Sequence, residues 1–299
     1  MKTRVVLNSP LGPPVVRDVV DGVWQTSTGD AETVLGDGLW ALPGLVDAHS
    51  HLASAELNYA PGILEDAKQR AREAVAAGVM LVMDKGWADT TTVQVAEQVP
   101  SGERPDIDAA AHILAVPEGY YPNFAREVDP SSIAEVAMDE ASLGLGWVKL
   151  IGDWPRRGRG PVANFTESEL EAAVSAAEAV GSKVAIHTMA RDVPSAAVAA
   201  GVHSIEHGLF LTEHDVGVLG SRSGMWVPTV LRMDETIAQI GAESTGGRLL
   251  SEGLANVEHL LPLAIEAGVH VLAGTDLIGA PADVADEAIR LHSAGMTVR

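Results

Sequence analysis

The chain alternates short apolar runs with longer amphipathic stretches, and this rhythm constrains its fold more than any other feature. Eight runs have the length and character of buried strands: Leu42–Ala48, Val79–Asp84, Ile107–Val116, Trp147–Ile151, Lys183–His187, Ser204–His207, Met225–Pro228 and His270–Ala273. Helical periodicity occupies several of the intervals: Ile63–Ala77, Ser131–Leu143, Glu167–Val180 and Leu249–Ala267. Eight β–α units over about 250 residues predict an α/β fold of the (β/α)8 TIM-barrel type.

Helix-end signals support this prediction. Gly78, Gly181 and Gly268 each follow a helical stretch just before the next strand, where a glycine C-cap is expected. Thr166 with Glu169 predicts a capping box at the start of another helix. A doubly wound open sheet is the alternative. The barrel is favoured because polar residues follow strands all along the series rather than at one switch point.

Residues 1–40 do not follow the rhythm. Their short strand-like segments are separated by turn residues at Pro10–Pro14, Asp21–Gly22 and Asp37–Gly38. We therefore expect a small N-terminal β element over residues 1–40 and the barrel over residues 41–299.

Composition narrows the classes of function. The formal net charge is −21, which repels phosphate backbones, so no nucleic-acid partner is expected. The start of the chain has no apolar core of signal-peptide length, and the longest apolar run, Ala74–Met83, is too short to cross a bilayer. We expect a cytoplasmic protein with no membrane partner and a small-molecule substrate. Cysteine is absent, so any metal must be held by nitrogen and oxygen ligands.

Histidines and a carboxylate stand at the C-terminal ends of the predicted strands, the face where barrels build active sites. His49 and His51 are spaced i, i+2, so a strand directs both imidazoles to one side. His187 ends the fifth run, His207 ends the sixth, and Asp276 follows the eighth. Neutral imidazoles that converge at strand ends are typical of a metal site.

Lys149 lies inside the apolar fourth run. A buried ammonium is costly and has no lone pair to offer a metal. Carboxylation of the amine would turn it into a bidentate oxygen ligand among the histidines. The alternative is an amine paired with a carboxylate across the barrel. The metal site would then hold one ion, on His49, His51, His187 and Asp276.

Six segments carry a resemblance that spans nearly the whole chain: PGLVDAHSHL, VKLI, VAIHTMA, GVHSIEHGLF, VPT and AGTD. On these motifs the chain resembles the amidohydrolase superfamily of metal-dependent (β/α)8 hydrolases, and within it the prolidase-like and imidazolonepropionase-like members. The resemblance implies two divalent metals per chain, zinc first among the candidates, bridged by carboxylated Lys149. It implies these ligands: His49, His51 and Asp276 for the more buried metal, His187 and His207 for the outer one.

The reaction implied is hydrolysis of an amide-type C–N bond in a dipeptide, an N-acyl amino acid or a cyclic amide. Metal-activated water would be the nucleophile, and Asp276 would be the catalytic base that passes the proton to the leaving nitrogen. Three alternatives stay open. They are deamination of a nitrogen heterocycle, hydrolysis of a lactone or phosphotriester on the same scaffold, and a catalytically inactive structural relative.

Loops after the strands are expected to bind the substrate. The candidate residues are aromatic or basic: Tyr120, Tyr121, Arg156, Arg157, Arg159, Arg232 and, within the third run, His112. Arginine forks suit carboxylates, so we expect a preference for substrates with a free carboxylate. The segment Asp84–Trp87 after the second run is placed similarly. The alternative for each loop is a solvated surface segment.

The end of the chain departs from the pattern of these relatives. They usually continue past the helix after the eighth strand into strands that complete a β-sandwich with the N-terminal segment. This sequence stops at Arg299, so either the protein is naturally short or its tail is missing. We therefore expect the N-terminal element to be a truncated β-sandwich with an exposed edge, which allows a homo-oligomer.

Overall fold

The computed structural model describes residues 2–9, 12–21, 23–36, 38–40, 42–54, 63–276 and 283–297. The chain divides into two compact units, Met1–Gly44 and Leu45–Arg299. Within the described ranges, no helix combines the length and the apolar character that a membrane span requires.

The N-terminal unit is a four-stranded sheet in the order β3-β2-β1-β4. Its strands are β1 (Lys2–Ser9), β2 (Gly12–Val20), β3 (Val23–Thr26) and β4 (Thr33–Leu35). β1 pairs antiparallel with β2 and parallel with β4. Arg4 lies opposite Asp18 across β1 and β2, and its Nε donates to the Asp18 carboxylate at 2.8 Å. Since Asp18 is only 1% exposed, this ion pair holds the register of the two strands.

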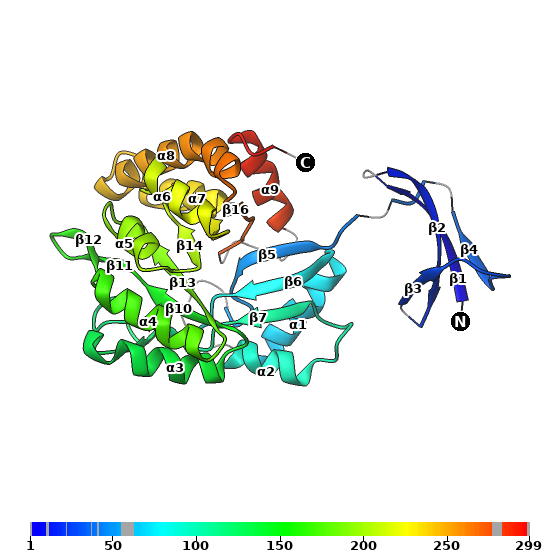
Figure 1. Cartoon of the computed structure of the whole chain (residues 1–299), viewed down its shortest axis with the longest axis horizontal. Helices are drawn as coiled ribbons and strands as arrows, with labels where there is room; N and C mark the ends of the chain where they lie inside the picture. The colour runs from blue at the N-terminus through cyan, green and yellow to red at the C-terminus, as the bar shows by residue number, and fades with distance from the viewer. Residues whose placement is uncertain are drawn as a thin grey trace. The chain divides into compact units, whose positions relative to one another are not determined.

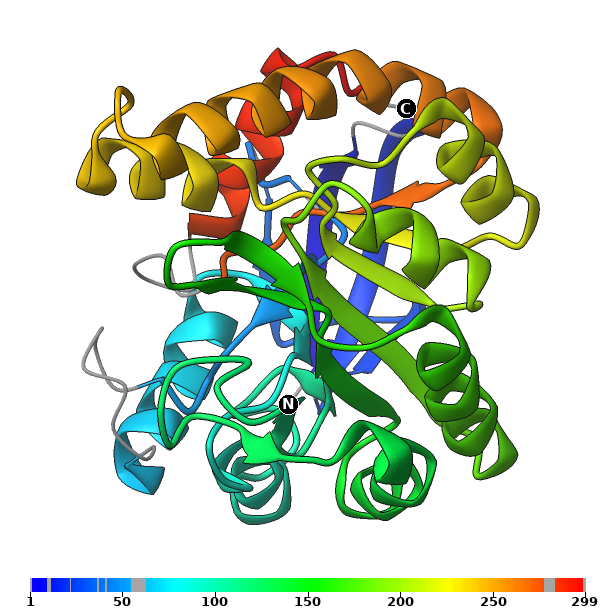
Figure 2. The ribbon, with the colours of Figure 1, turned by 90° about the vertical axis from the view of Figure 1, so that its left-hand side faces the viewer.

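The larger unit is a barrel of parallel strands surrounded by helices (Figures 1 and 2). One sheet has the order β5-β6-β7 and the other the order β16-β15-β14-β13-β10-β8-β9. Backbone hydrogen bonds join the two sheets: Leu145 donates to Ala109 at 2.7 Å, and Ala48 donates to Ala273 at 2.9 Å. Because both sides are joined, the strands form a closed ring, and the predicted (β/α)8 barrel is confirmed.

The barrel strands in chain order are β5 (Leu45–Ser50), β6 (Val79–Asp84), β7 (Asp106–Ala109) with β8 (Ile113–Ala115), β10 (Trp147–Ile151), β13 (Lys183–Thr188), β14 (Ser204–His207), β15 (Met225–Val227) and β16 (His270–Val271). The helices are α1 (Leu64–Ala76), α2 (Thr91–Gln98), α3 (Ile133–Leu143), α4 (Glu167–Ala179), α5 (Val193–Ala199), α6 (Glu213–Ser221), α7 (Val230–Ile240), α8 (Thr245–Ala267) and α9 (Val284–Ser293). A short strand β9 (Arg126–Glu127) and a 3-10 turn η2 (Pro130–Ser132) precede α3. The capping box predicted at Thr166 and Glu169 is present at the start of α4.

Three segments differ from the sequence prediction. The third run is divided because β7 pairs with β6 whereas β8 pairs with β10, so the chain passes from one neighbour to the next. A hairpin of β11 (Asp153–Arg156) and β12 (Gly160–Ala163) follows the fourth strand, where a loop was expected. Helix α8 begins before the predicted Leu249, because Ser244 caps it by accepting from the backbone N–H of Gly247.

Side chains fill the lower part of the barrel interior, so it is a packed core rather than a pore. One buried cluster there brings together residues of five strands and Ala110, which directly follows β7: Ala48, Met83, Ala110, Trp147, Ala185 and Val227. In β10, Val148 and Leu150 belong to the separate core between strands and helices. Because side chains alternate along a strand, Trp147 and Lys149 face the interior instead. The packed interior thus supports a polar site at the C-terminal strand ends.

Candidate metal centre

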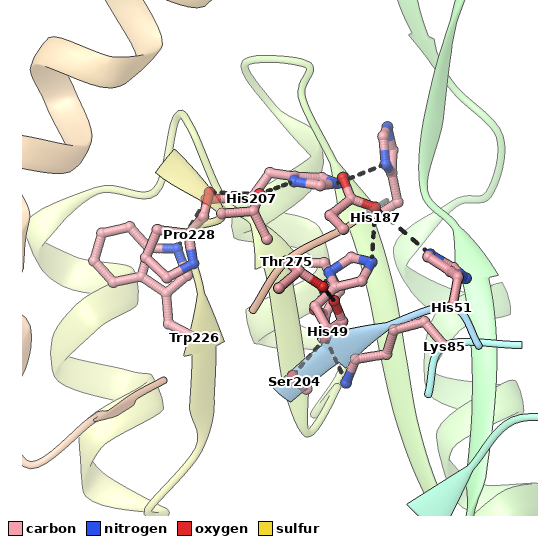
Figure 3. A network of polar contacts seen from close by, with 12 residues as sticks. His49, His51, Lys85, His187, Ser204, His207, Trp226, Pro228 and Thr275 are labelled. Atoms are coloured by element: carbon pink, nitrogen blue, oxygen red, sulfur yellow. Dashed lines mark hydrogen bonds and ion pairs between the residues drawn. The ribbon is translucent and has the colours of Figure 1, made fainter. Parts of the chain in front are cut away.

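Five of the predicted ligands lie together at the C-terminal end of the barrel, and Figure 3 labels the four histidines among them. His49, His51 and Asp276 offer three ligand atoms within 4.8 Å of one another. The Nε2 atoms of His49 and His51 lie 3.2 and 3.5 Å from Asp276 Oδ1. His207 Nε2 lies 3.0 Å from His187 Nδ1 and 3.9 Å from Asp276 Oδ2. Asp276 therefore stands between two pairs of histidines.

The backbone at three neighbouring strand ends adopts the left-handed conformation. The φ angles are +63° at His207, +49° at Thr229 and +45° at Asp276. Such angles are unfavourable for residues other than glycine and tend to occur at functional sites. At His207 the turn lets two consecutive side chains, Glu206 and His207, both contact the histidine cluster.

The Nδ1 atoms of His49 and His51 each contact an acceptor oxygen. His49 Nδ1 lies 2.7 Å from Glu206 Oε2, and His51 Nδ1 lies 2.7 Å from the backbone oxygen of Gly86. Because both partners are acceptors, these contacts favour the tautomer that carries the proton on Nδ1. The lone pairs of both Nε2 atoms are therefore directed toward Asp276, as in metal sites with an oriented outer shell.

Glu206 is the centre of a buried polar network that the sequence analysis missed. Its carboxylate is fully buried and accepts from Ser204 Oγ at 2.6 Å, while Lys85 Nζ lies 3.1 Å from the same oxygen. Figure 3 labels Ser204 and Lys85 below His49. Burial alone would raise the pKa of Glu206, but the charges of Lys85 and its neighbours hold this pKa well below the usual range. The inward position of Glu206 could have been predicted from strand alternation, because Ser204 and Glu206 lie on one face of the strand and Ile205 lies on the other.

We predict that Glu206→Gln weakens binding of a divalent metal by about 10- to 100-fold, because the anion that orients His49 and supports its basicity is lost. Competition with a chromophoric chelator would measure the affinity. Ser204→Ala is the matched control, because it removes one hydrogen bond to the carboxylate and keeps the charge; its affinity should change less than about threefold. Equal affinity of Glu206→Gln and wild type would contradict the orienting role.

Two threonines position His207 and Asp276, and neither threonine was predicted from the sequence. Thr229 Oγ1 lies 2.6 Å from His207 Nδ1, and the backbone N–H groups after Thr229 are capped by Glu287 of α9. Thr275 donates from its hydroxyl and its backbone to the Asp47 carboxylate, at 2.7 and 3.0 Å. These bonds link the first barrel strand, β5, to the segment after the last one, β16, and they fix the residue that precedes Asp276.

Burial lowers the pKa values of histidines in the cluster and so favours their neutral form. It lowers the pKa of His49 to about 4 and that of His207 to about 3. It also lowers the pKa of Lys149, which is 2% exposed, to about 8. In the part of the chain that the structure describes, Lys149 Nζ and His187 Nε2 have no hydrogen-bond partner. These side chains are therefore chemically available as ligands.

A cavity of about 930 Å³ opens over the cluster. All six residues predicted as metal ligands line its base: His49, His51, Lys149, His187, His207 and Asp276. Of the predicted substrate residues, Tyr120, Tyr121 and Arg232 line its walls. Burial of a small molecule next to the cluster is thus sterically allowed.

The remaining predicted substrate residues lie elsewhere. Arg157 and Arg159 are exposed at the tip of the β11–β12 hairpin and do not line the cavity. Arg156 is bound to neighbouring loops, since it donates to the backbone oxygens of Pro117 and Glu118 and to Asn164.

His112 also differs from its expected place. Its ring contacts Glu140 of α3, with Nδ1 3.1 Å from the carboxylate, so it faces the helix layer rather than the barrel interior. That carboxylate raises the pKa of His112. His112 does not line the cavity and lies in the break between β7 and β8.

Comparison with known proteins agrees with this architecture. An uncharacterized protein of Mycobacterium bovis is 34% identical over 289 residues, which are 93% of this chain and 76% of that protein. A solved Xaa-Pro dipeptidase with bound methionine in its active site has a TM-score of 0.78 at 20% identity, covering 99% of this chain and 84% of its own. A prolidase complexed with N-methylphosphonate-L-proline has a TM-score of 0.75 at 21% identity, covering 98% and 83%.

The solved structures support the fold alone. The family is shown by a match of the amino-acid sequence. Residues 40–297 match the amidohydrolase family, whose members are hydrolases that typically bind divalent metal. The match spans the barrel and every residue of the histidine cluster. The chain is therefore a metal-dependent hydrolase that belongs to the amidohydrolase family.

Proposed function

We propose that this hydrolase cleaves an amide-type C–N bond at a two-metal centre, with zinc as the first candidate metal. The observation that carries the proposal is the set of buried acceptor atoms of His49, His51 and Asp276 within 4.8 Å of one another. Lone pairs this close repel one another in a buried site unless a proton or a metal cation lies among them, and three such atoms around one point suit a metal ion. Imidazole nitrogen and carboxylate oxygen are ligands that zinc accepts, so the residues fit the metal.

The ligands would fall into two sets: His49, His51 and Asp276 for one ion, and His187 with His207 for the other. Lys149 would bridge them as a carbamate. In that modification the neutral amine adds through its lone pair to CO2 and releases one proton, which leaves an anionic carbamate. The buried Nζ of Lys149, without a hydrogen-bond partner among the described residues, supports this role.

The divalent ions, when bound, would polarise the substrate carbonyl and lower the pKa of the attacking water. Asp276 would accept the proton of that water at its carboxylate and donate it to the leaving nitrogen. Burial alone would raise the pKa of Asp276, but the neighbouring histidines hold it well below its usual range. The carboxylate is thus ionised and ready to act as a base.

Activity of metal-depleted and zinc-reconstituted protein tests this proposal. We expect hydrolysis of some members of a panel of dipeptides, N-acyl amino acids and cyclic amides, lost on metal removal and restored by zinc. Turnover of lactones, phosphotriesters or amino-substituted nitrogen heterocycles, with every amide left intact, would contradict it.

Among the arginines that the sequence predicted to bind substrate, Arg232 is the one that lines the cavity. It lines the cavity at the start of α7, its side chain is 13% exposed, and its ion pair with Glu235 is long at 3.7 Å. Arg156, in contrast, is bound to backbone oxygens of the neighbouring loop. We therefore propose that substrates carry a free carboxylate, as dipeptides and N-acyl amino acids do.

We predict that Arg232→Gln raises KM for an N-acyl amino acid by about 10- to 150-fold, the worth of a charge-assisted bidentate contact. The amidated analogue should bind poorly to wild type and be unaffected by the substitution. Arg157→Gln is the control, because this exposed arginine does not line the cavity. Equal cleavage of free-acid and amidated substrates by wild type would refute the preference.

A further inference from the structure

Aromatic side chains are concentrated on one wall of the cavity. Tyr120 and Tyr121 follow the third barrel strand, Trp154 follows the fourth, and all three line the cavity. Aromatic residues make up only 4% of this chain, which has three tyrosines in total. Two of those three therefore stand beside the histidine cluster, where they are partly buried against a small core cluster and also line the cavity.

The three rings of this aromatic wall pack edge-on against one another. The ring centroids of Tyr120 and Tyr121 each lie 4.6 Å from that of Trp154, at interplanar angles of 64° and 69°. Behind them, Phe124 packs against Trp87 at 4.2 Å, and both of these rings are buried. A preformed wall loses little conformational freedom when a ligand binds.

The wall continues to the reactive part of the site. The His187 ring lies 5.9 Å from the Trp154 ring and 6.5 Å from the Tyr120 ring. In an edge-on pair the ring that points its edge at its partner keeps its own faces free of that contact. Since Trp154 and both tyrosines are only partly buried, their uncovered surface is open to the cavity. A flat apolar group could thus pack there within reach of the cluster.

Barrel topology sets the aromatic wall opposite Arg232. The wall follows the third and fourth strands, β8 and β10, whereas Arg232 follows the seventh, β15. In a closed ring of eight strands, the third and seventh are four positions apart and face each other across the mouth. The histidine cluster lies at the base between them. A substrate whose carboxylate contacts Arg232 therefore directs its other end toward the aromatic rings.

We infer that this enzyme is specific for substrates with an aromatic ring on the acyl side of the scissile amide, such as N-arylacyl amino acids or dipeptides with an aromatic N-terminal residue. This inference rests on the proposed amide hydrolysis and adds the chemistry of the acyl group. Trp154, with Tyr120 and Tyr121, would determine that specificity by ring–ring contact, while Arg232 binds the carboxylate on the other side.

Three substrates that differ only in the acyl group test the inference: N-phenylacetyl-, N-cyclohexylacetyl- and N-acetyl-L-alanine. We expect kcat/KM to be about tenfold higher for the phenylacetyl than for the cyclohexylacetyl compound, mainly through KM, because ring–ring contacts add to simple burial. The acetyl compound should be the poorest. Trp154→Leu should bring the phenylacetyl to cyclohexylacetyl ratio close to one. Tyr121→Leu is a second variant that should lower the ratio if Trp154→Leu fails to fold.

Ile240→Ala is the matched control, because Ile240 lines the cavity from α7 and is 46% exposed. It should lower affinity for both ring compounds equally and leave their ratio unchanged. Calorimetric binding of the same compounds to Asp276→Asn protein, in which turnover is slow, separates the two proposals. Preferential binding of the phenylacetyl compound without hydrolysis of any amide by wild type would support the aromatic site and contradict the proposed reaction. Hydrolysis or binding without preference for the phenylacetyl compound would overturn the aromatic site alone.

Discussion

Asp276→Asn is expected to lower kcat at least about 100-fold, because asparagine cannot accept the proton of the attacking water. The substitution is isosteric, and the backbone bond from Asp276 N to the His49 carbonyl at 2.8 Å does not depend on the side chain. The variant should therefore fold, with a circular dichroism spectrum and melting temperature near those of wild type. Steady-state kinetics on the best amide substrate would measure the loss.

Asp153→Asn is the matched control for that experiment. Asp153 is also a buried carboxylate near a strand end, but it accepts from the backbone of Met189 and Ala190 and does not line the cavity. Its amide can keep one acceptor oxygen, so kcat should stay within a few-fold of wild type. Near-normal turnover of Asp276→Asn protein that retains its metal would show that another group moves the proton.

Lys149→Ala is the second substitution with a large expected effect. Because we propose that Lys149 bridges the two metals as a carbamate, its removal should lower activity by more than about 100-fold. Losing a residue that only orients a metal ligand typically costs about 10- to 100-fold. Short carboxylic acids such as acetate or propionate should restore part of the activity, since their two oxygens can occupy the site of the carbamate. Lys149→Arg should be inactive and should not respond to these acids, because its guanidinium fills the same space with a permanent positive charge.

Lys183→Ala controls for the loss of a lysine near the barrel. Lys183 begins β13 and is exposed, with its Nζ 5.6 Å from the Trp147 ring. Activity of this variant should be close to that of wild type and insensitive to added acids. If Lys149→Ala behaved in the same way, carboxylation of Lys149 would have no part in the reaction.

The barrel could be predicted from the sequence because its strands are buried on both sides and appear as continuous apolar runs. Histidines at the ends of these runs had to meet, since the carboxyl ends of parallel strands share one rim. The break between β7 and β8 could not be predicted in the same way. It depends on which neighbour each half pairs with, and the run from Ile107 to Val116 carries no sign of that change.

The contacts of individual side chains were harder to predict from the sequence than the positions of the strand ends. Strand alternation places Glu206 in the interior beside His49, but the approach of the next residue, His207, to the same cluster depends on its positive φ, and nothing in the local sequence signals a left-handed histidine. The arginines after the fourth strand were predicted to bind the substrate because they are positive charges in an acidic chain. Arg156, however, contacts carbonyl oxygens some forty residues away, a pairing that only the folded hairpin creates.

The metal content of the purified protein tests the central claim most directly. Elemental analysis of protein grown with added zinc should find close to two divalent ions per chain, and at most about one in Lys149→Ala, which lacks the bridge. Protein with no more than trace metal under these conditions, yet active on an amide substrate, would contradict the account.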